Sequence, residues 1–240
     1  MAQRQMTHSE KFLINRMEKY PTLQVLAEYG ENFKKASRSL VIMDCLIRGQ
    51  RSDYDDIVAA QDEDEKLTFE SFERLHGYFY PFRFKPELRE VLEIYIIAKN
   101  FARSERSRKL LRNLPKEHRK PAFLEEAVLS FIQFGILPEL EKLSLYQIET
   151  FRNALKYRIS VSENIKVKAK ATDFSDSEQL IALVSCVCDV AGIAGQYNIT
   201  GSLTLTEEVA DDILFLIENS KNPLTANTLF SRTDTPVGEN

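Results

Sequence analysis

The chain has 240 residues, a formal net charge of −4, 43% hydrophobic and 28% charged residues, which is ordinary for a folded protein and excludes broad intrinsic disorder. Its three cysteines, Cys45, Cys186 and Cys188, are too few for a disulfide framework, which favours a reducing compartment. Residues 180–195 form the longest apolar stretch, but it is too short to cross a bilayer, and residues 1–12 lack the apolar run of a secretory signal. We therefore expect a cytoplasmic protein that does not bind membranes.

Apolar residues recur at helical spacing through most of the chain, which predicts an all-α fold with several helices packed as a compact bundle-like domain. The first segments are a short helix over 12–20, a helix over 23–47 that Gly30 interrupts and Gly49 ends, an acid-rich helix capped by Ser52, and a helix over 68–77. Pro86 is well placed to begin a long helix that continues to residue 114. Further helices are expected over 121–135 and after Ser144.

The last third of the chain contains one exception to the helical pattern. Residues 157–171 alternate with a period of two, which predicts a small β-hairpin with three lysines on one face. A capping-box spacing at Ser175 starts a helix that ends near residue 195, and Thr204 is the expected cap of a last helix to about residue 219. We expect one domain over 1–222, with a candidate sub-boundary near 115–121, and a flexible tail over 223–240.

Charge is sorted along the chain in blocks. Residues 53–73 contain nine acids against one lysine, whereas residues 103–120 contain eight bases against two acids, and eleven acids follow residue 172. Such blocks create strong local fields, and these select charged partners. The bases expected to contact a partner or nucleic acid are Arg103, Arg106, Lys109, Lys116, Arg119 and Lys120. Aromatic side chains that would stack on bases are scarce in this segment, so a charged protein partner or self-association is favoured and nucleic acid is the alternative.

Arg112 and His118 flank a short polar segment, with Asn113 directly after the arginine. This spacing resembles the catalytic motif of HEPN-type ribonucleases, which are small all-helical domains. The resemblance implies that Arg112 would stabilise charge on the scissile phosphate and that His118 would act as general acid or base. The alternative is that this segment is a polar linker between two helices.

Two lone acids lie inside apolar helical segments, Asp44 and Asp189. A carboxylate in such surroundings must be paired, hydrogen-bonded or protonated, because burying it without a partner costs several kcal/mol. Both are therefore candidate ligand-binding residues that could line one pocket, together with Gln196 and Asn198. The alternative is that each acid simply pairs with a base of a neighbouring helix.

Metal and cofactor motifs are sparse. Glu73 and His76 have the spacing of a helix-bundle metal site, but this motif occurs only once. The acids of residues 207–212 have a spacing used for Mg²⁺ in all-helical nucleotide pyrophosphatases, but dipole compensation at a helix start is the favoured explanation. We therefore expect no metal site and no cofactor.

The charge blocks favour a non-catalytic regulatory or interaction module that binds a charged partner through separate acidic and basic surfaces. The alternative is an all-α enzyme acting on phosphate esters. Such an enzyme would be either a metal-independent ribonuclease using Arg112 and His118 or a metal-dependent phosphohydrolase using Asp189 and residues 207–212.

Overall fold

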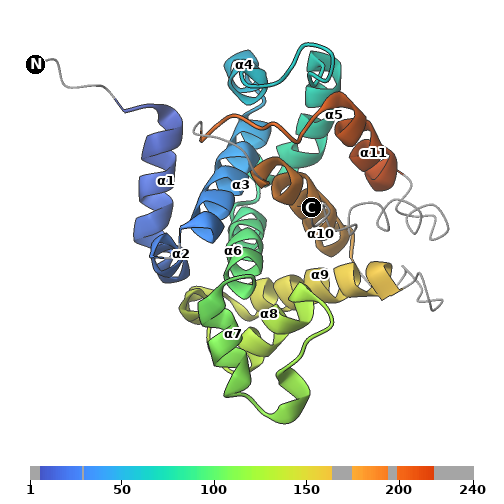
Figure 1. Ribbon diagram of the computed structural model, residues 1–240. Helices are drawn as coiled ribbons and strands as arrows, with labels where there is room; N and C mark the ends of the chain where they lie inside the picture. Colours follow the sequence, from blue (N-terminus) through green and yellow to red (C-terminus); the bar gives the residue numbers. More distant parts are fainter. Residues whose placement is uncertain (1–5, 29, 164–174, 194–198, 219–240) are drawn as a thin grey trace, which may run out of the picture.

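Three helices pack against one another in pairs at the centre of the molecule: α3 (Glu31–Arg48), α6 (Pro86–Ala102) and α10 (Asp176–Gly192) (Figure 1). The computed structural model describes residues 6–28, 30–163, 175–193 and 199–218, and within these it contains eleven α-helices and no strand. The other α-helices are α1 (His8–Lys19), α2 (Pro21–Ala27), α4 (Arg51–Val58), α5 (Phe69–Phe79), α7 (Glu105–Arg112), α8 (Leu124–Gln133), α9 (Leu145–Glu163) and α11 (Glu207–Glu218). Short 3-10 helices are η1 (Tyr80–Arg83), η2 (Lys116–His118) and η3 (Pro138–Lys142). The all-α prediction is confirmed.

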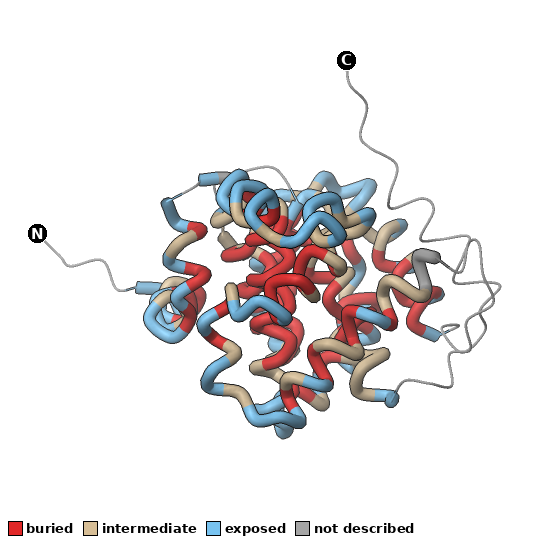
Figure 2. The backbone as a smooth tube through the Cα atoms, turned by 90° about the horizontal axis from the view of Figure 1, so that it is seen from below, coloured by how far each residue is buried: buried red, intermediate tan, exposed pale blue. Residues whose placement is uncertain are grey.

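The buried residues gather along these central helices, and the exposed ones lie on the surrounding helices and loops (Figure 2). From Val91 to Ala102, helix α6 is buried on every side, as expected for a helix that other helices surround. Its buried positions include Glu93, Lys99 and Asn100, so this core helix also carries charge into the interior. No described helix is long and apolar enough to cross a membrane.

Glycines set both ends of α3, as the sequence predicts. Gly30 has φ 66° before the helix, and Gly49 has φ 64° and ψ 30° at its end, the left-handed conformation; glycine adopts such positive φ values without steric cost. An added Cβ at Gly49 would collide with the ring of His76, whose Nδ1 lies 2.6 Å from the Leu46 carbonyl oxygen. The end of α3 and the side of α5 therefore approach closely at Gly49.

The long helix predicted over 86–114 is wrong, because the chain turns at Ser104. The Ser104 hydroxyl accepts a hydrogen bond from the Ser107 amide at 3.2 Å, and the Ser107 hydroxyl donates to the Ala102 carbonyl at 2.7 Å. These side chains end α6 and start α7, since serine competes for backbone hydrogen bonds. Two other predicted caps are also wrong: Gln50 rather than Ser52 caps α4, and the Thr204 hydroxyl donates to the Val190 carbonyl instead of capping α11.

The hairpin predicted over 157–171 is wrong where the structure describes it, because residues 157–163 are the end of α9. Phe151, Ala154 and Leu155 form a buried stripe at helical spacing that precedes this segment, and Tyr157 is buried as well. Packing of this stripe extends the helix beyond the point at which the local pattern changes. Residues 164–171 lie outside the described part of the chain.

The domain boundaries stay predictions. Helix α8, which follows the polar linker at 115–121, packs against α6, which precedes it. The C-terminal tail predicted over 223–240 lies outside the described residues.

Candidate functional site

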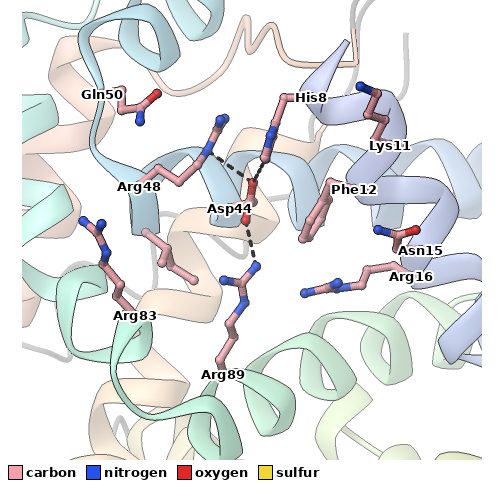
Figure 3. A pocket seen from close by; sticks show the side chains of 11 residues that line it. His8, Lys11, Phe12, Asn15, Arg16, Asp44, Arg48, Gln50, Arg83 and Arg89 are labelled. Carbon is pink, nitrogen blue, oxygen red and sulfur yellow. Dashed lines mark hydrogen bonds and ion pairs between the residues drawn. The ribbon is translucent and has the colours of Figure 1, made fainter. Parts of the chain in front are cut away.

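Asp44 lines a cavity of about 600 Å³, here called the Asp44 pocket, between α1, α3, η1 and α6 (Figure 3). Its Oδ1 accepts a hydrogen bond from Arg89 Nη2 at 2.7 Å, and its Oδ2 lies 3.0 Å from His8 Nε2 and 3.3 Å from Arg48 Nε. The Asp44 side chain is only 6% exposed. The surrounding cations therefore compensate for the hydration that this carboxylate loses.

A second buried carboxylate, Glu93 on α6, extends this network. Its Oε1 accepts hydrogen bonds from Arg16 at 2.8 Å and from Arg89 at 3.0 Å, and its Oε2 accepts one from the Tyr20 hydroxyl at 2.6 Å. Burial and the Glu93 carboxylate both raise the pKa of Tyr20, so the phenol keeps its proton and donates. Arg89 thus bridges Asp44 and Glu93 and connects α1, α3 and α6.

Asp189, the other lone acid, lines a separate cavity of about 450 Å³ with mainly apolar walls between α6, α8, α10 and α11. Its Oδ2 lies 2.7 Å from Lys99 Nζ and 3.3 Å from Arg103 Nη2, and Lys99 Nζ also lies 3.2 Å from Glu125 Oε1. Burial alone would raise the pKa of Asp189, but Lys99 and Arg103 outweigh it and hold this pKa well below its usual range. Burial alone would lower the pKa of Lys99, but Asp189 and Glu125 raise it above its usual value.

Lys35 on α3 lines the same cavity without an ion pair or hydrogen bond from its side chain to the described residues. Burial lowers the pKa of Lys35 to about 8, and the attraction of Asp189 opposes this shift only in part. Part of the Lys35 population is therefore neutral near physiological pH, unlike the fully paired Lys99.

Asp44 and Asp189 do not share a cavity. Gly192, one turn after Asp189, abuts the first half of α3, where an added Cβ would lie 2.9 Å from the Lys35 carbonyl oxygen and overlap Ser39. Asp44 belongs to the last turns of α3. Each acid pairs with bases from other helices, which is the alternative that the sequence left open. Gln196 and Asn198 lie outside the described residues.

A third cavity, of about 750 Å³, follows the predicted basic segment and is here called the basic groove. It runs from the end of α6 along α7 and the turn after η2 to the start of α8. Its charged lining residues are Arg103, Arg108, Arg112, Arg119 and Lys120, and no carboxylate lines it within the described part of the chain. Arg103 also lines the Asp189 cavity, so the two spaces adjoin.

The bases predicted to contact a partner are only partly in this groove. Arg103, Arg119 and Lys120 line it, and Arg119 Nε also donates to the Leu114 carbonyl at 2.8 Å. Arg106 and Lys109 do not line it: they lie 3.9 Å from Glu28 and 3.0 Å from Glu105, respectively. Lys116 is exposed in η2 and also lies outside the groove lining.

Arg112 and His118 point to different surroundings. Arg112 lines the basic groove, whereas His118 Nδ1 lies 3.0 Å from the Ser130 hydroxyl and the His118 ring packs edge-on against Phe134. His118 is not among the residues that line the groove. The ribonuclease hypothesis stays a prediction, and the geometry does not strengthen it.

The acidic segments far apart in sequence come together at the other end of the molecule. Helix α11 packs against α5, and α4, α5 and α11 lie at the top of Figure 1 while α7 and α8 lie at the bottom. We call this surface the acidic face; its exposed acids are Asp55, Asp56, Asp62, Glu63, Asp64, Glu65, Glu70, Glu73, Glu208, Asp211 and Glu218. The sequence predicted separate acidic and basic surfaces, but not that two acidic segments form one of them.

Three of the acids proposed for metal binding have other partners. Glu207 accepts hydrogen bonds from the Thr68 amide at 2.7 Å and the Ser71 hydroxyl at 2.7 Å, so it holds the start of α5. Asp211 lies 3.7 Å from Arg74, and Asp189 is paired in its own cavity. The described residues contain no group of three or more side chains arranged to hold a metal ion.

Several residues that build these sites were missed in the sequence. Lys99 follows the apolar run from Ile94 to Ala98, which is the same signal that marked Asp44, so it was detectable. Arg83 and Arg89 gave no such signal, since only the packing of α6 and η1 against α3 brings them to the Asp44 pocket. Comparison with protein-family models, with curated proteins and with solved structures finds no match to this chain.

Proposed function

We propose that this chain is a non-catalytic regulatory or interaction module that binds a charged partner, and that the basic groove contacts an acidic protein segment. One observation carries the proposal: five cations line a concave surface of about 750 Å³, with no carboxylate among its described lining residues. Like charges repel one another in such a groove, and an anionic partner relieves this repulsion.

The groove keeps donors available for a partner. The side chains of Arg112 and Lys120 form no hydrogen bond or ion pair within the described part of the chain. Guanidinium groups match carboxylates through two parallel hydrogen bonds, so an acidic segment suits the arginines of this groove.

The composition of the groove favours protein over nucleic acid. Phe123 is its only aromatic residue among those described, and it is partly buried at the start of α8. Binding of single-stranded nucleic acid relies on aromatic side chains that stack on successive bases. An acidic polypeptide needs no such platform.

The acidic face at the opposite end supports the same reading. Opposite fields at two ends orient the molecule as it approaches a charged partner and accelerate the encounter at low salt. Much of this face stays unpaired, since Arg51, Lys66 and Arg74 are the cations that contact its acids among the described residues.

The experiment is fluorescence anisotropy with a labelled polyglutamate peptide, with single-stranded RNA of equal formal charge as comparison. We expect the wild type to bind the peptide, about tenfold more weakly when NaCl rises from roughly 50 to 300 mM. Arg112→Glu and Lys120→Glu should each weaken binding strongly, whereas Lys34→Glu, the same change at an exposed residue of α3 outside the groove, should not.

Equal affinities in Arg112→Glu and Lys34→Glu, or no salt-sensitive binding, would refute the proposal. Tighter binding of RNA than of the peptide would indicate that the partner is nucleic acid and not an acidic protein. RNA cleavage that is abolished in His118→Ala would indicate that the chain is a ribonuclease and not a non-catalytic module.

A further inference from the structure

The Asp44 pocket carries more positive than negative charge. The cations that line it are Lys11, Arg16, Arg48, Arg83 and Arg89, and the carboxylates that contact these cations are Asp44, Asp53 and Glu93. Five cations against three carboxylates leave an excess of two positive charges, with His8 counted as neutral. A bound dianion would balance this excess.

Much of the donor capacity of this pocket is unused. Arg83 and Lys11 form no side-chain hydrogen bond or ion pair with the described residues, and both are exposed. Arg89 uses Nε and Nη2 for its two carboxylates, and Arg16 uses only Nη2. The Nη1 groups of Arg16 and Arg89 form no described hydrogen bond and remain for an acceptor inside the pocket, whereas Arg16 Nε is buried.

These donors come from different elements and line one cavity, with Lys11 and Arg83 on opposite sides of it (Figure 3). Lys11 and Arg16 belong to α1, Arg83 to η1 and Arg89 to α6 (Figure 3). Their carboxylate partners fix Arg16 and Arg89, since a guanidinium held on one edge presents its other edge in a set direction. Arg16 and Arg89 are thus preorganised for an anion, whereas the exposed Lys11 and Arg83 side chains would turn toward it.

The size of the pocket indicates more than a bare anion. Its volume of about 600 Å³ is in the range of small-molecule sites. Phe12 and Ile47 are the apolar residues among its described lining, and the Phe12 ring lies 4.4 Å from the Arg16 guanidinium. A small organic group would lie against these two side chains.

We propose that the Asp44 pocket binds a small phosphate monoester, with its phosphoryl group at the free edges of Arg16 and Arg89 and with the exposed Lys11 and Arg83 side chains turning toward it from opposite sides (Figure 3). At neutral pH such a group carries nearly two negative charges and three acceptor oxygens, which match the charge excess and the several donors. Asp44 and Glu93 do not contact the ligand. They hold the arginines in place.

Binding would also fix α1 to the rest of the molecule. Helix α1 is joined to α3 and α6 through polar contacts, including Arg16 to Glu93 and Lys19 to Glu90 at 2.7 Å. A ligand between Lys11 on α1 and Arg83 on η1 adds a further bridge across this interface. Amide hydrogen exchange in α1 should therefore slow when the ligand binds.

The test uses the full chain, isothermal titration calorimetry and thermal unfolding in a phosphate-free buffer of constant ionic strength. The probes are glucose 6-phosphate, inorganic phosphate and glucose. We expect saturable binding of glucose 6-phosphate, a rise in Tm and no effect of glucose. Arg83→Ala and Lys11→Ala should each weaken binding about tenfold, the effect of losing one charge-assisted contact.

Both variants remove exposed side chains without described partners, so they are expected to fold. Lys34→Ala is the matched control, and its affinity should equal that of the wild type. Arg112→Glu should also leave phosphate binding unchanged, so failure of the basic groove and failure of this pocket are distinguishable.

Comparable affinities for inorganic phosphate and the ester would support the phosphoryl site and identify free phosphate as a sufficient ligand. The proposal is overturned if neither phosphate species gives saturable heat. It is also overturned if chloride at equal ionic strength stabilises the protein as much, or if Arg83→Ala binds like Lys34→Ala.

Discussion

Replacing Asp189 by asparagine is expected to lower the free energy of unfolding by about 3 kcal/mol at pH 7. Asp189 Oδ2 lies 2.7 Å from Lys99 Nζ, and the Lys99 side chain is only 5% exposed. Removing one member of a buried ion pair costs about 3–5 kcal/mol, because the other charge stays buried without its partner. We expect the lower end of this range because Glu125, 3.2 Å from Lys99, remains.

Urea unfolding followed by far-ultraviolet circular dichroism measures this difference. The folded-state pKa of Asp189 lies below its unfolded value of about 3.9, so its carboxylate stabilises the fold above that pH and loses this effect as the pH falls. The difference between wild type and variant should therefore shrink below about pH 4. Asp211→Asn, the same change at a side chain that is 61% exposed, should cost less than about 0.5 kcal/mol. A loss in Asp189→Asn as small as this control would refute the reasoning.

Three further substitutions test other parts of the fold. Gly192→Ala should cost about 2 kcal/mol or more in urea unfolding, because its Cβ would overlap Ser39 where α10 meets α3. Lys35→Met should stabilise the protein by about 1 kcal/mol at pH 7, after allowance for the partial exposure of Lys35. Between pH 8 and about 10.4, Lys35 is neutral in the folded protein but still protonated in the unfolded chain. The wild type therefore gains stability over this range, and the advantage of the variant fades. Ser104→Ala should lower the free energy of unfolding by about 1 kcal/mol, and with it the Tm, since it removes the side-chain cap of α7.

The sequence predicted helix ends best where one residue determines the local geometry. Gly49 ends α3 because its left-handed conformation suits glycine, and Ser175 begins α10 through a capping box with Glu178. Prediction failed where distant contacts decide. The Glu207 carboxylate has the spacing of a local cap, yet it bonds the start of α5, which lies far away in the sequence.

The same division applies to the candidate sites. A lone carboxylate in an apolar helix needs a partner, and Asp44 and Asp189 are indeed paired, while their role as ligand-binding residues stays a prediction. Which cations they meet depends on helix packing, so the sequence could not reveal that the two acids occupy separate cavities. The basic groove was visible as a block of charge, but its concave shape required the turn at Ser104.

The pairing of α3 with α10 has a consequence during synthesis. Ribosomes add about 5–20 residues per second, so α3 leaves the exit tunnel on the order of ten seconds before residues 176–192 follow. During that interval the apolar side of α3 that α10 later covers is exposed on the nascent polypeptide, where it can bind chaperones or promote aggregation. A fragment that ends before Asp176 would leave this apolar side of α3 exposed permanently. Deletions should therefore spare both α3 and α10.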